Sequence, residues 1–219
     1  MKQGFYDMEK IFFRPGGMEL TGRLAEQIGI GPDSEILDIG CGAGATLLFL
    51  KEKYGCRVSG VDLSPEAAAK ARSVVPEADV RCENAACLSF EDSSFDAAFM
   101  ECTLTLFDDP HKALKEAYRV LKSGGALVIS VITADGPEPV QNGAADPGAL
   151  VRALNGTGFK DISRSDEKNA LTQLLCDIIF EYGSMEEYLR DAEERLGGTV
   201  LNCDLKKKGI SYGVFICRK

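Results

Sequence analysis

The chain has 219 residues, of which 45% are hydrophobic and 27% are charged, a balance typical of a soluble globular protein. This composition argues against a disordered or collagen-like chain, and the length suits one domain with room for an appendage. The 34 acidic residues outnumber the 25 basic residues, which gives a net charge of −9. A nucleic-acid partner needs a cationic face, so we expect no nucleic-acid partner.

No apolar run approaches the ~18 residues of a membrane span, and the first residues lack the apolar core of a signal peptide. We therefore expect a cytoplasmic protein with no membrane partner. The eight cysteines form no Cys-x-x-Cys pair, so we interpret most of them as reduced thiols. Zinc needs clustered Cys or His ligands. Because His111 is the only histidine, we expect no structural metal.

The first half of the chain alternates short apolar runs with helical patterns. A helix is expected to begin near Met18, and another from Pro65, where Ser64 suits the N-cap. Two more helices are predicted at 46–54 and 110–121. Strands are predicted at 36–39, 57–62, 79–83, 95–100 and 126–132, with a turn at 122–125. Strands that alternate with helices indicate parallel βαβ units and an α/β sheet.

The second half is less regular. Residues 133–147 are rich in proline and predict a loop long enough to act as a lid. Further elements are predicted at 147–154 (helix), 159–165 (strand), 171–182 and 185–196 (helices) and 212–217 (strand). The two late helices break the alternation, so we expect them to form a cap over the sheet.

A glycine-rich turn, Asp38-Ile39-Gly40-Cys41-Gly42-Ala43-Gly44, follows the first predicted strand. Glycines there allow a sharp turn and a close approach by a ligand. Asp62 ends the next strand, the position that binds ribose hydroxyls in nucleotide-binding α/β folds. The pattern Gly40-x-Gly42-x-x-Ala45 also fits the loose dinucleotide motif. However, Asp38 faces a pyrophosphate poorly and suits a cationic group, such as the ammonium of S-adenosylmethionine (SAM).

At these residues the chain resembles the class I SAM-dependent methyltransferases, of the methyltransferase type 11/25 kind. The matching stretches are DIGCGAG (38–44), VDLSPE (61–66), FEDSSFDAAF (90–99) and DDPHKALKEAYRVLKSGGALVIS (108–130). The resemblance implies a Rossmann-like α/β fold, with a mostly parallel seven-stranded sheet, helices on both faces and a small helical cap. It implies one domain over residues 1–219. Its core would cover about 30–165 and a last strand 210–218, and its cap 1–20 and 166–209.

The resemblance also implies SAM as cofactor, S-adenosylhomocysteine as its product, and a set of binding residues. Asp38 would order the turn and bind the methionine ammonium, while Gly40 and Gly42 would leave space beside the ligand. Asp62 would bind both ribose hydroxyls, and Leu63 would lie against adenine. The full set of expected cofactor-binding residues is Asp38, Gly40, Cys41, Gly42, Asp62, Leu63, Asn84, Ala85, Glu101 and Arg14.

Asn84 stands where the family commonly has an Asp that accepts from the adenine amino group, and its amide oxygen could accept instead. The alternative for Asn84 is a turn residue. Arg14 could pair with a SAM or substrate carboxylate, or lie in a surface turn. Glu101 would lie beside the methionine part of SAM, or stay a strand-end carboxylate in solvent.

No catalytic base can be identified, and the candidates are Glu101, Cys102 and His111. For His111 we favour an exposed helix start over a base. Cys102 lies in a stretch that resembles arsenite methyltransferases, which makes arsenite an alternative acceptor if Cys176 and Cys203 converge on Cys102. A packed strand-end thiol is the other interpretation.

The expected function is methyl transfer from SAM to a small-molecule acceptor in a pocket closed by the cap. The protein would be a monomer or a homodimer. A non-catalytic SAM-binding protein and an NAD-binding protein remain as further alternatives.

Overall fold

The structure is a computed structural model that describes residues 14–136, 143–196 and 209–219. The helices are α2 (Gly17–Ile28), α3 (Ala45–Tyr54), α4 (Pro65–Val74), α5 (Pro110–Val120), α6 (Pro147–Thr157), α7 (Lys168–Tyr182) and α8 (Met185–Leu196), with a short 3₁₀ helix η1 (Leu104–Leu106). The strands are β1 (Glu35–Ile39), β2 (Arg57–Asp62), β3 (Asp79–Cys82), β4 (Phe95–Glu101), β5 (Leu121–Thr133), β6 (Lys160–Asp166) and β7 (Ser211–Arg218).

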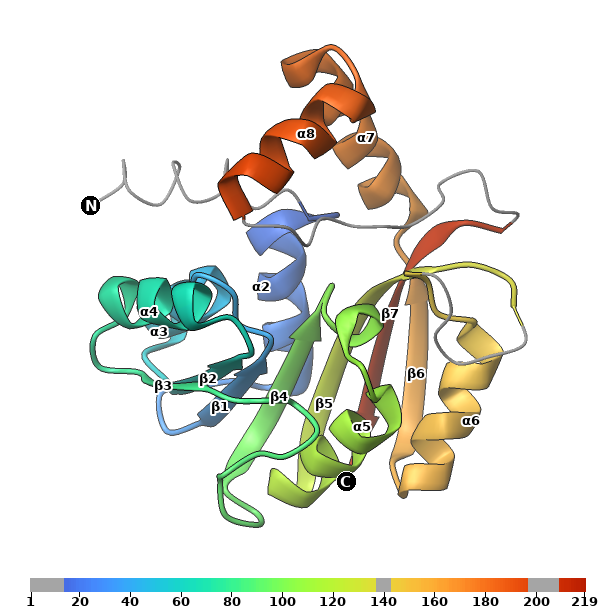
Figure 1. The fold of residues 1–219 in the computed structure, drawn as a ribbon. Helices are drawn as coiled ribbons and strands as arrows, with labels where there is room; N and C mark the ends of the chain where they lie inside the picture. The colour runs from blue at the N-terminus through green and yellow to red at the C-terminus, as the bar shows by residue number, and fades with distance from the viewer. Residues whose placement is uncertain (1–13, 137–142, 197–208) are drawn as a thin grey trace.

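The strands form one seven-stranded sheet in the order β3-β2-β1-β4-β5-β7-β6 (Figure 1). The pairs from β3 to β5 are parallel, whereas β7 runs antiparallel between β5 and β6. Parallel strands place their carboxyl ends at one edge, where open α/β sheets bind ligands. The predicted fold class is confirmed: a mostly parallel, Rossmann-like α/β sheet.

Helices cover both faces of the sheet, and each face has its own apolar cluster. Side chains of neighbouring strand residues point to opposite faces, so Ile36 packs with α2, α3 and α4 while Leu37 packs with α5 and α6. Both side chains are fully buried. The two-sided burial explains why the central strands are apolar without alternation.

Local sequence signals set several helix starts. The Ser64 hydroxyl accepts a hydrogen bond from the Ala67 N–H, and Pro65 takes the first helical position of α4. These caps agree with the prediction. The predicted turn at 122–125 is instead the irregular first part of β5, where Gly124 has φ 77°. It stays in the sheet because Gly124 and Gly125 exchange backbone hydrogen bonds with Lys219.

Helices α7 and α8 lie over the carboxyl-end edge of the sheet, as Figure 1 shows. Leu171 joins the main core, whereas Leu174, Ile178 and Tyr188 form a small separate cluster. The cap therefore buries only part of its apolar surface. Ile179 (53% exposed) and Phe180 (94% exposed) face solvent.

Three expected segments fall partly outside the described residues: the start of the chain before Arg14, the predicted lid loop and the last part of the expected cap, 197–208. The described ends of the lid loop pack against β5. The Ala134 N–H donates a hydrogen bond to the Ala145 carbonyl, and Ala144 and Ala145 are buried. In the described ranges, no helix is long and apolar enough to cross a membrane.

Candidate active site

The glycine turn connects β1 to α3 and is tied to the neighbouring strand. The N–H groups of Gly40 and Cys41 both donate to the Val61 carbonyl, at 2.8 and 2.9 Å. Gly40, Gly42 and Gly44 have φ values of 84°, 52° and 86°, a left-handed conformation that glycine adopts without a Cβ penalty. The sequence therefore folds here into a tight turn at the carboxyl-end edge of the sheet.

Asp62 lies at the end of β2 with both carboxylate oxygens oriented by backbone donors. Oδ2 accepts from the Gly42 N–H at 2.8 Å, and Oδ1 accepts from the Ser64 N–H at 2.9 Å. Each carboxylate oxygen can accept more than one hydrogen bond. Asp62 thus organises the glycine turn, a role that we had expected of Asp38, and keeps acceptor capacity toward a ligand.

Two residues of the turn differ from expectation. A Cβ on Gly40 would lie 2.5 Å from Thr103 Cγ2, so Thr103 fills the space that we expected a ligand to use. The Cys41 thiol is buried and packs against Gly60, where a Cβ would lie 2.8 Å from its sulfur. Burial raises the pKa of the Cys41 thiol well above its ordinary value. The side chain of Cys41 therefore faces the core, not a ligand.

The expected adenine-binding residues follow β2 and β3. Leu63 is 63% exposed directly after Asp62, which leaves an apolar side chain open at the rim. The Asn84 side-chain oxygen accepts from the Ala86 N–H at 2.8 Å. This turn contact uses the oxygen that we expected to face the adenine amino group. Ala85 is buried.

Asp38 is a buried carboxylate near the end of β1, with 4% of its surface exposed. Burial, and next the charge of Glu101, raise the pKa of Asp38 to about 8, although Arg14 opposes the shift. Among the described residues, no side chain or backbone N–H donates a hydrogen bond to this carboxylate. A buried carboxylate without such a partner favours a neutral form or a cationic ligand.

Glu101, at the end of β4, is the centre of a buried polar network. Its oxygens accept from the hydroxyls of Thr21 and Thr46, both at 2.8 Å, and it pairs with the Arg14 guanidinium at 2.8 Å. Arg14 also donates to both threonines and to the sulfur of Met18. Glu101 is thus not a strand-end carboxylate in solvent. Arg14 is neither in a surface turn nor unpaired toward a ligand carboxylate, because the protein itself supplies its partners.

Cys102 follows Glu101 and has a positive φ of 59°. Its sulfur lies 3.0 Å from the Tyr212 hydroxyl, which donates to the Ser130 hydroxyl at 2.8 Å. Burial raises the pKa of Cys102 to about 11. Cys176 is exposed on α7, and Cys203 lies outside the described residues. No group of three His, Cys, Asp or Glu side chains suited to a metal ion occurs in residues 14–136, 143–196 and 209–219.

Sequence reasoning missed Tyr212 and Ser130 because both lie in apolar strand runs, where a polar residue carries no motif. His111 is exposed in the first turn of α5. Asp109 caps that helix by accepting from the Lys112 N–H. This placement matches an exposed helix start.

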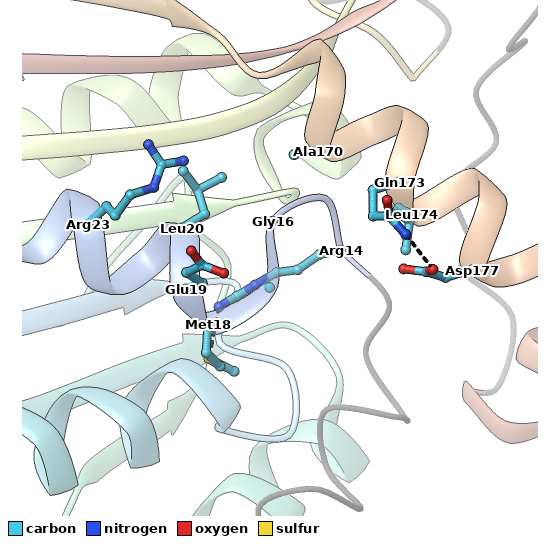
Figure 2. A pocket seen from close by; sticks show the side chains of 11 residues that line it. Arg14, Gly16, Met18, Glu19, Leu20, Arg23, Ala170, Gln173, Leu174 and Asp177 are labelled. Carbon is cyan, nitrogen blue, oxygen red and sulfur yellow. Dashed lines mark hydrogen bonds between the residues drawn. The ribbon is translucent and has the colours of Figure 1, made fainter.

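A pocket of about 430 Å³ lies between the start of α2 and α7 (Figure 2). Its lining residues are Arg14, Gly16, Gly17, Met18, Glu19, Leu20, Arg23, Ala170, Gln173, Leu174 and Asp177. Arg14 connects this pocket to the glycine turn, because the same guanidinium bonds to Thr46 in the first turn of α3. The pocket is therefore next to the ligand-binding edge of the sheet.

Residues 37–129 match the model of the methyltransferase domain family. This segment holds the glycine turn, Asp62 and the strand end at Glu101 in the geometry described above. This segment therefore matches a methyltransferase domain, and the chain has the fold of a solved protein that binds SAM.

Several proteins are similar to this chain. It is 32% identical to an uncharacterized protein of Haemophilus influenzae, over 70% of this chain and 65% of that protein. It is 29% identical to the sarcosine/dimethylglycine N-methyltransferase of Halorhodospira halochloris, over 84% of this chain and 68% of that enzyme. Phosphoethanolamine N-methyltransferase 2 of Haemonchus contortus, solved in complex with SAM, has the same fold. Its TM-score is 0.77 at 21% identity, and the match covers 100% of this chain and 57% of that one.

The chain thus spans 65%, 68% and 57% of the length of these three proteins. The family match covers Asp38, Asp62 and Cys102 but not Arg14 or the α2–α7 pocket. The α2–α7 pocket therefore lies in segments that the family model does not describe.

Proposed function

We propose that this protein transfers the methyl group of SAM to a small-molecule acceptor held between α2 and α7. The observation that carries the proposal is the pair of carboxylates, Asp38 and Asp62, at the carboxyl ends of adjacent strands beside the glycine turn. One carboxylate is buried without a hydrogen-bond donor among the described residues, and the other is oriented by two backbone N–H groups.

The residues present fit SAM. Asp38 suits the methionine ammonium, because a cation offsets the cost of its buried charge. Asp62 can accept from two ribose hydroxyls, and the exposed Leu63 offers an apolar surface to adenine. Asn84 contributes less than we expected, since its oxygen already accepts from Ala86. The wall beside the methionine end of SAM would be formed by Glu101, Arg14, Thr21 and Thr46.

When bound, SAM supplies an electrophilic methyl group on a sulfonium. The protein's task is then to hold an acceptor in line with that methyl group, which accounts for much of the rate in such displacements. The α2–α7 pocket supports this role, because it adjoins the cofactor edge through Arg14 and has both polar and apolar walls. Both oxygens of Glu101 are occupied, so we assign no catalytic base.

The alternatives gain no support from these contacts. Cys102 bonds to Tyr212 and not to a second thiol, which disfavours arsenite as acceptor. A buried Asp38 disfavours the pyrophosphate of NAD. The described cysteines are all unpaired thiols, which suits the cytoplasm that we expected, where thiols stay reduced.

Two experiments test the proposal. Thermal unfolding with SAM, S-adenosylhomocysteine and NAD should show a raised midpoint with the first two ligands only, since a ligand of the native state stabilises it. Labelled SAM should then transfer label to a component of a metabolite pool. Parallel incubations contain cell RNA, cell protein, and arsenite with a thiol. Label in RNA or protein alone, or stabilisation by NAD alone, would contradict the proposal.

A further inference from the structure

The α2–α7 pocket has an apolar wall and a charged lining. The apolar wall consists of Met18, Leu20 and Leu174, which are at most 7% exposed. The charged side chains are two cations and two carboxylates, namely Arg14, Arg23, Glu19 and Asp177. Their formal charges cancel. The acceptor that the pocket favours therefore depends on which of these four charges already has a partner in the protein.

Both cations have a carboxylate partner that does not line the pocket. Arg14 pairs with Glu101 at 2.8 Å, and Arg23 pairs with Glu167 at 3.1 Å. Breaking a buried ion pair leaves one charge uncompensated, which is costly. An acidic acceptor that bound Arg14 would have to displace Glu101. One that bound Arg23 would lie beside the negative charge of Glu167. Neither cation is therefore available to a phosphate or a carboxylate.

The two carboxylates of the lining have no cationic partner in the described part of the chain. Glu19 forms no hydrogen bond or ion pair there, and Asp177 accepts only from the side-chain amide of Gln173, at 2.8 Å. Figure 2 shows the two carboxylates on opposite sides of the pocket, Glu19 on α2 and Asp177 on α7. The pocket thus has two carboxylates without a counter-charge, one on each wall.

The cofactor edge beside the pocket is acidic as well. Burial, and next the charge of Glu101, raise the pKa of Asp38 to about 8, and Asp62 adds to this shift. Arg14 opposes the shift by less than Glu101 promotes it. The negative potential at this edge therefore has the same sign as that of the pocket. Complementary charge steers a partner to a site and suppresses partners of like charge.

We propose that the acceptor carries a cationic nitrogen group, which lies between Glu19 and Asp177, and an uncharged apolar part that packs on the apolar wall. This inference rests on the proposed SAM-dependent function and adds the substrate class. The pocket volume of about 430 Å³ lies in the range of small-molecule sites. A protonated nitrogen has no lone pair, so the cationic group serves recognition, and a second atom of the acceptor takes the methyl group.

The test compares probes that share one apolar skeleton and differ in charge: phenethylamine, phenethyl alcohol and phenylpropionate. Ligand-observed NMR gives their dissociation constants for the full chain, with S-adenosylhomocysteine bound. We expect the amine to bind about tenfold or more tightly than the acid, with the alcohol between them, and salt to reduce this difference. The trimethylammonium analogue of the amine has no lone pair at any pH. It should bind within about threefold of the amine.

Variants locate the cationic group. Glu19→Gln and Asp177→Asn should each weaken amine binding by up to about fivefold, and the double variant by about tenfold, as for exposed ion pairs. Binding of the alcohol should not change. Glu91→Gln is the matched control, because Glu91 is an exposed carboxylate before β4 and outside the pocket lining. It should leave amine binding unchanged. The double variant Glu19→Lys, Asp177→Lys should bind the acid more tightly than the amine.

The inference is wrong if the acid binds as tightly as the amine, if the amine does not bind at all, or if the Glu19→Gln, Asp177→Asn variant binds the amine as before. Thermal unfolding with SAM is measured on the same proteins. Stabilisation by SAM in any of these cases leaves the proposed function intact. An unmodified protein that fails to bind SAM would overturn the proposed function, and this inference with it.

Discussion

The guanidinium of Arg14 and the carboxylate of Glu101 form a buried ion pair, 2.8 Å apart, that fastens the start of α2 to the end of β4. The side chain of Glu101 is 3% exposed and that of Arg14 is 14% exposed. Thr21 and Thr46 each bond to both members of the pair. The network thereby joins three elements, α2, α3 and β4, around the point where the pocket meets the cofactor edge.

Removing one member of this pair should cost far more than removing both. Glu101→Gln leaves the Arg14 cation buried without its counter-charge, and we expect a loss of about 3–5 kcal/mol in the free energy of unfolding. The double variant Arg14→Met, Glu101→Gln should be more stable than Glu101→Gln alone. Urea unfolding measures the free energy of unfolding of the single and the double variant. Equal destabilisation of the single and double variants would show that the pair is not coupled.

Asp62→Ala removes the acceptor of the Gly42 N–H and the carboxylate that we propose for the two ribose hydroxyls. We expect SAM binding to weaken by about 2–3 kcal/mol, using the usual strength of hydrogen bonds to charged groups. Asp62→Asn keeps one carbonyl acceptor and should lose less. Titration calorimetry gives the affinities, and circular dichroism checks the fold. Unchanged affinity in a folded Asp62→Ala protein would contradict the placement of the ribose.

The SAM affinity should depend on pH through Asp38. Its folded-state pKa of about 8 lies above the ordinary value of 3.8, so the native state favours the protonated form. Stability therefore falls as pH rises from about 4 to about 8. An ammonium ligand needs the ionised form, so the dissociation constant should decrease by up to about tenfold per pH unit between pH 6 and 8. Calorimetry across this range should give a flat profile for Asp38→Asn.

Gly40→Ala should destabilise the fold even without a ligand. The new Cβ would lie 2.5 Å from Thr103 Cγ2, in a residue with φ 84°. Together, left-handed strain and overpacking predict a loss of about 2–5 kcal/mol. Gly29→Ala is the matched control, since Gly29 has φ 80° and no atom within 4 Å of a Cβ. It should show the backbone strain alone. Similar unfolding midpoints for the two variants would refute the contact with Thr103.

Ala170→Trp should fill the α2–α7 pocket from its α7 wall. We expect the KM for the acceptor to rise by about tenfold or more while SAM affinity stays unchanged, because only acceptor binding is blocked. Asn169→Trp adds the same bulk one residue earlier, outside the pocket lining, and should leave both values unchanged. An Ala170→Trp protein with an unaltered acceptor KM would place the acceptor elsewhere.

Much of the fold could be predicted because local signals and the buried core agree. The limits of β2 at Arg57 and Asp62 and of α8 at Met185 and Leu196 are those expected from the sequence. Ser64 and Pro65 fixed the start of α4 through a short-range cap. Such signals depend on neighbours in the chain, so one sequence is enough to read them.

The candidate site was less predictable, because its contacts join residues distant in the sequence. Nothing near Arg14 indicates that its partner is Glu101, and nothing near Gly40 indicates Thr103 as the group that excludes a side chain. The resemblance implied that Arg14 and Gly40 lie beside the ligand. In the structure, Arg14 pairs with Glu101, and Thr103 fills the space beside Gly40.

The place of β7 in the sheet has a consequence for how the protein forms. In the order β5-β7-β6, the strand between 211 and 218 is inserted between two strands that precede it in the sequence. On a ribosome, the strands from β3 to β5 can assemble as soon as they emerge, since synthesis favours early segments. Strand β6 has no partner until β7 arrives. Tyr212 likewise reaches Cys102 only then, so a nascent chain can hold the glycine turn before it holds the thiol contact.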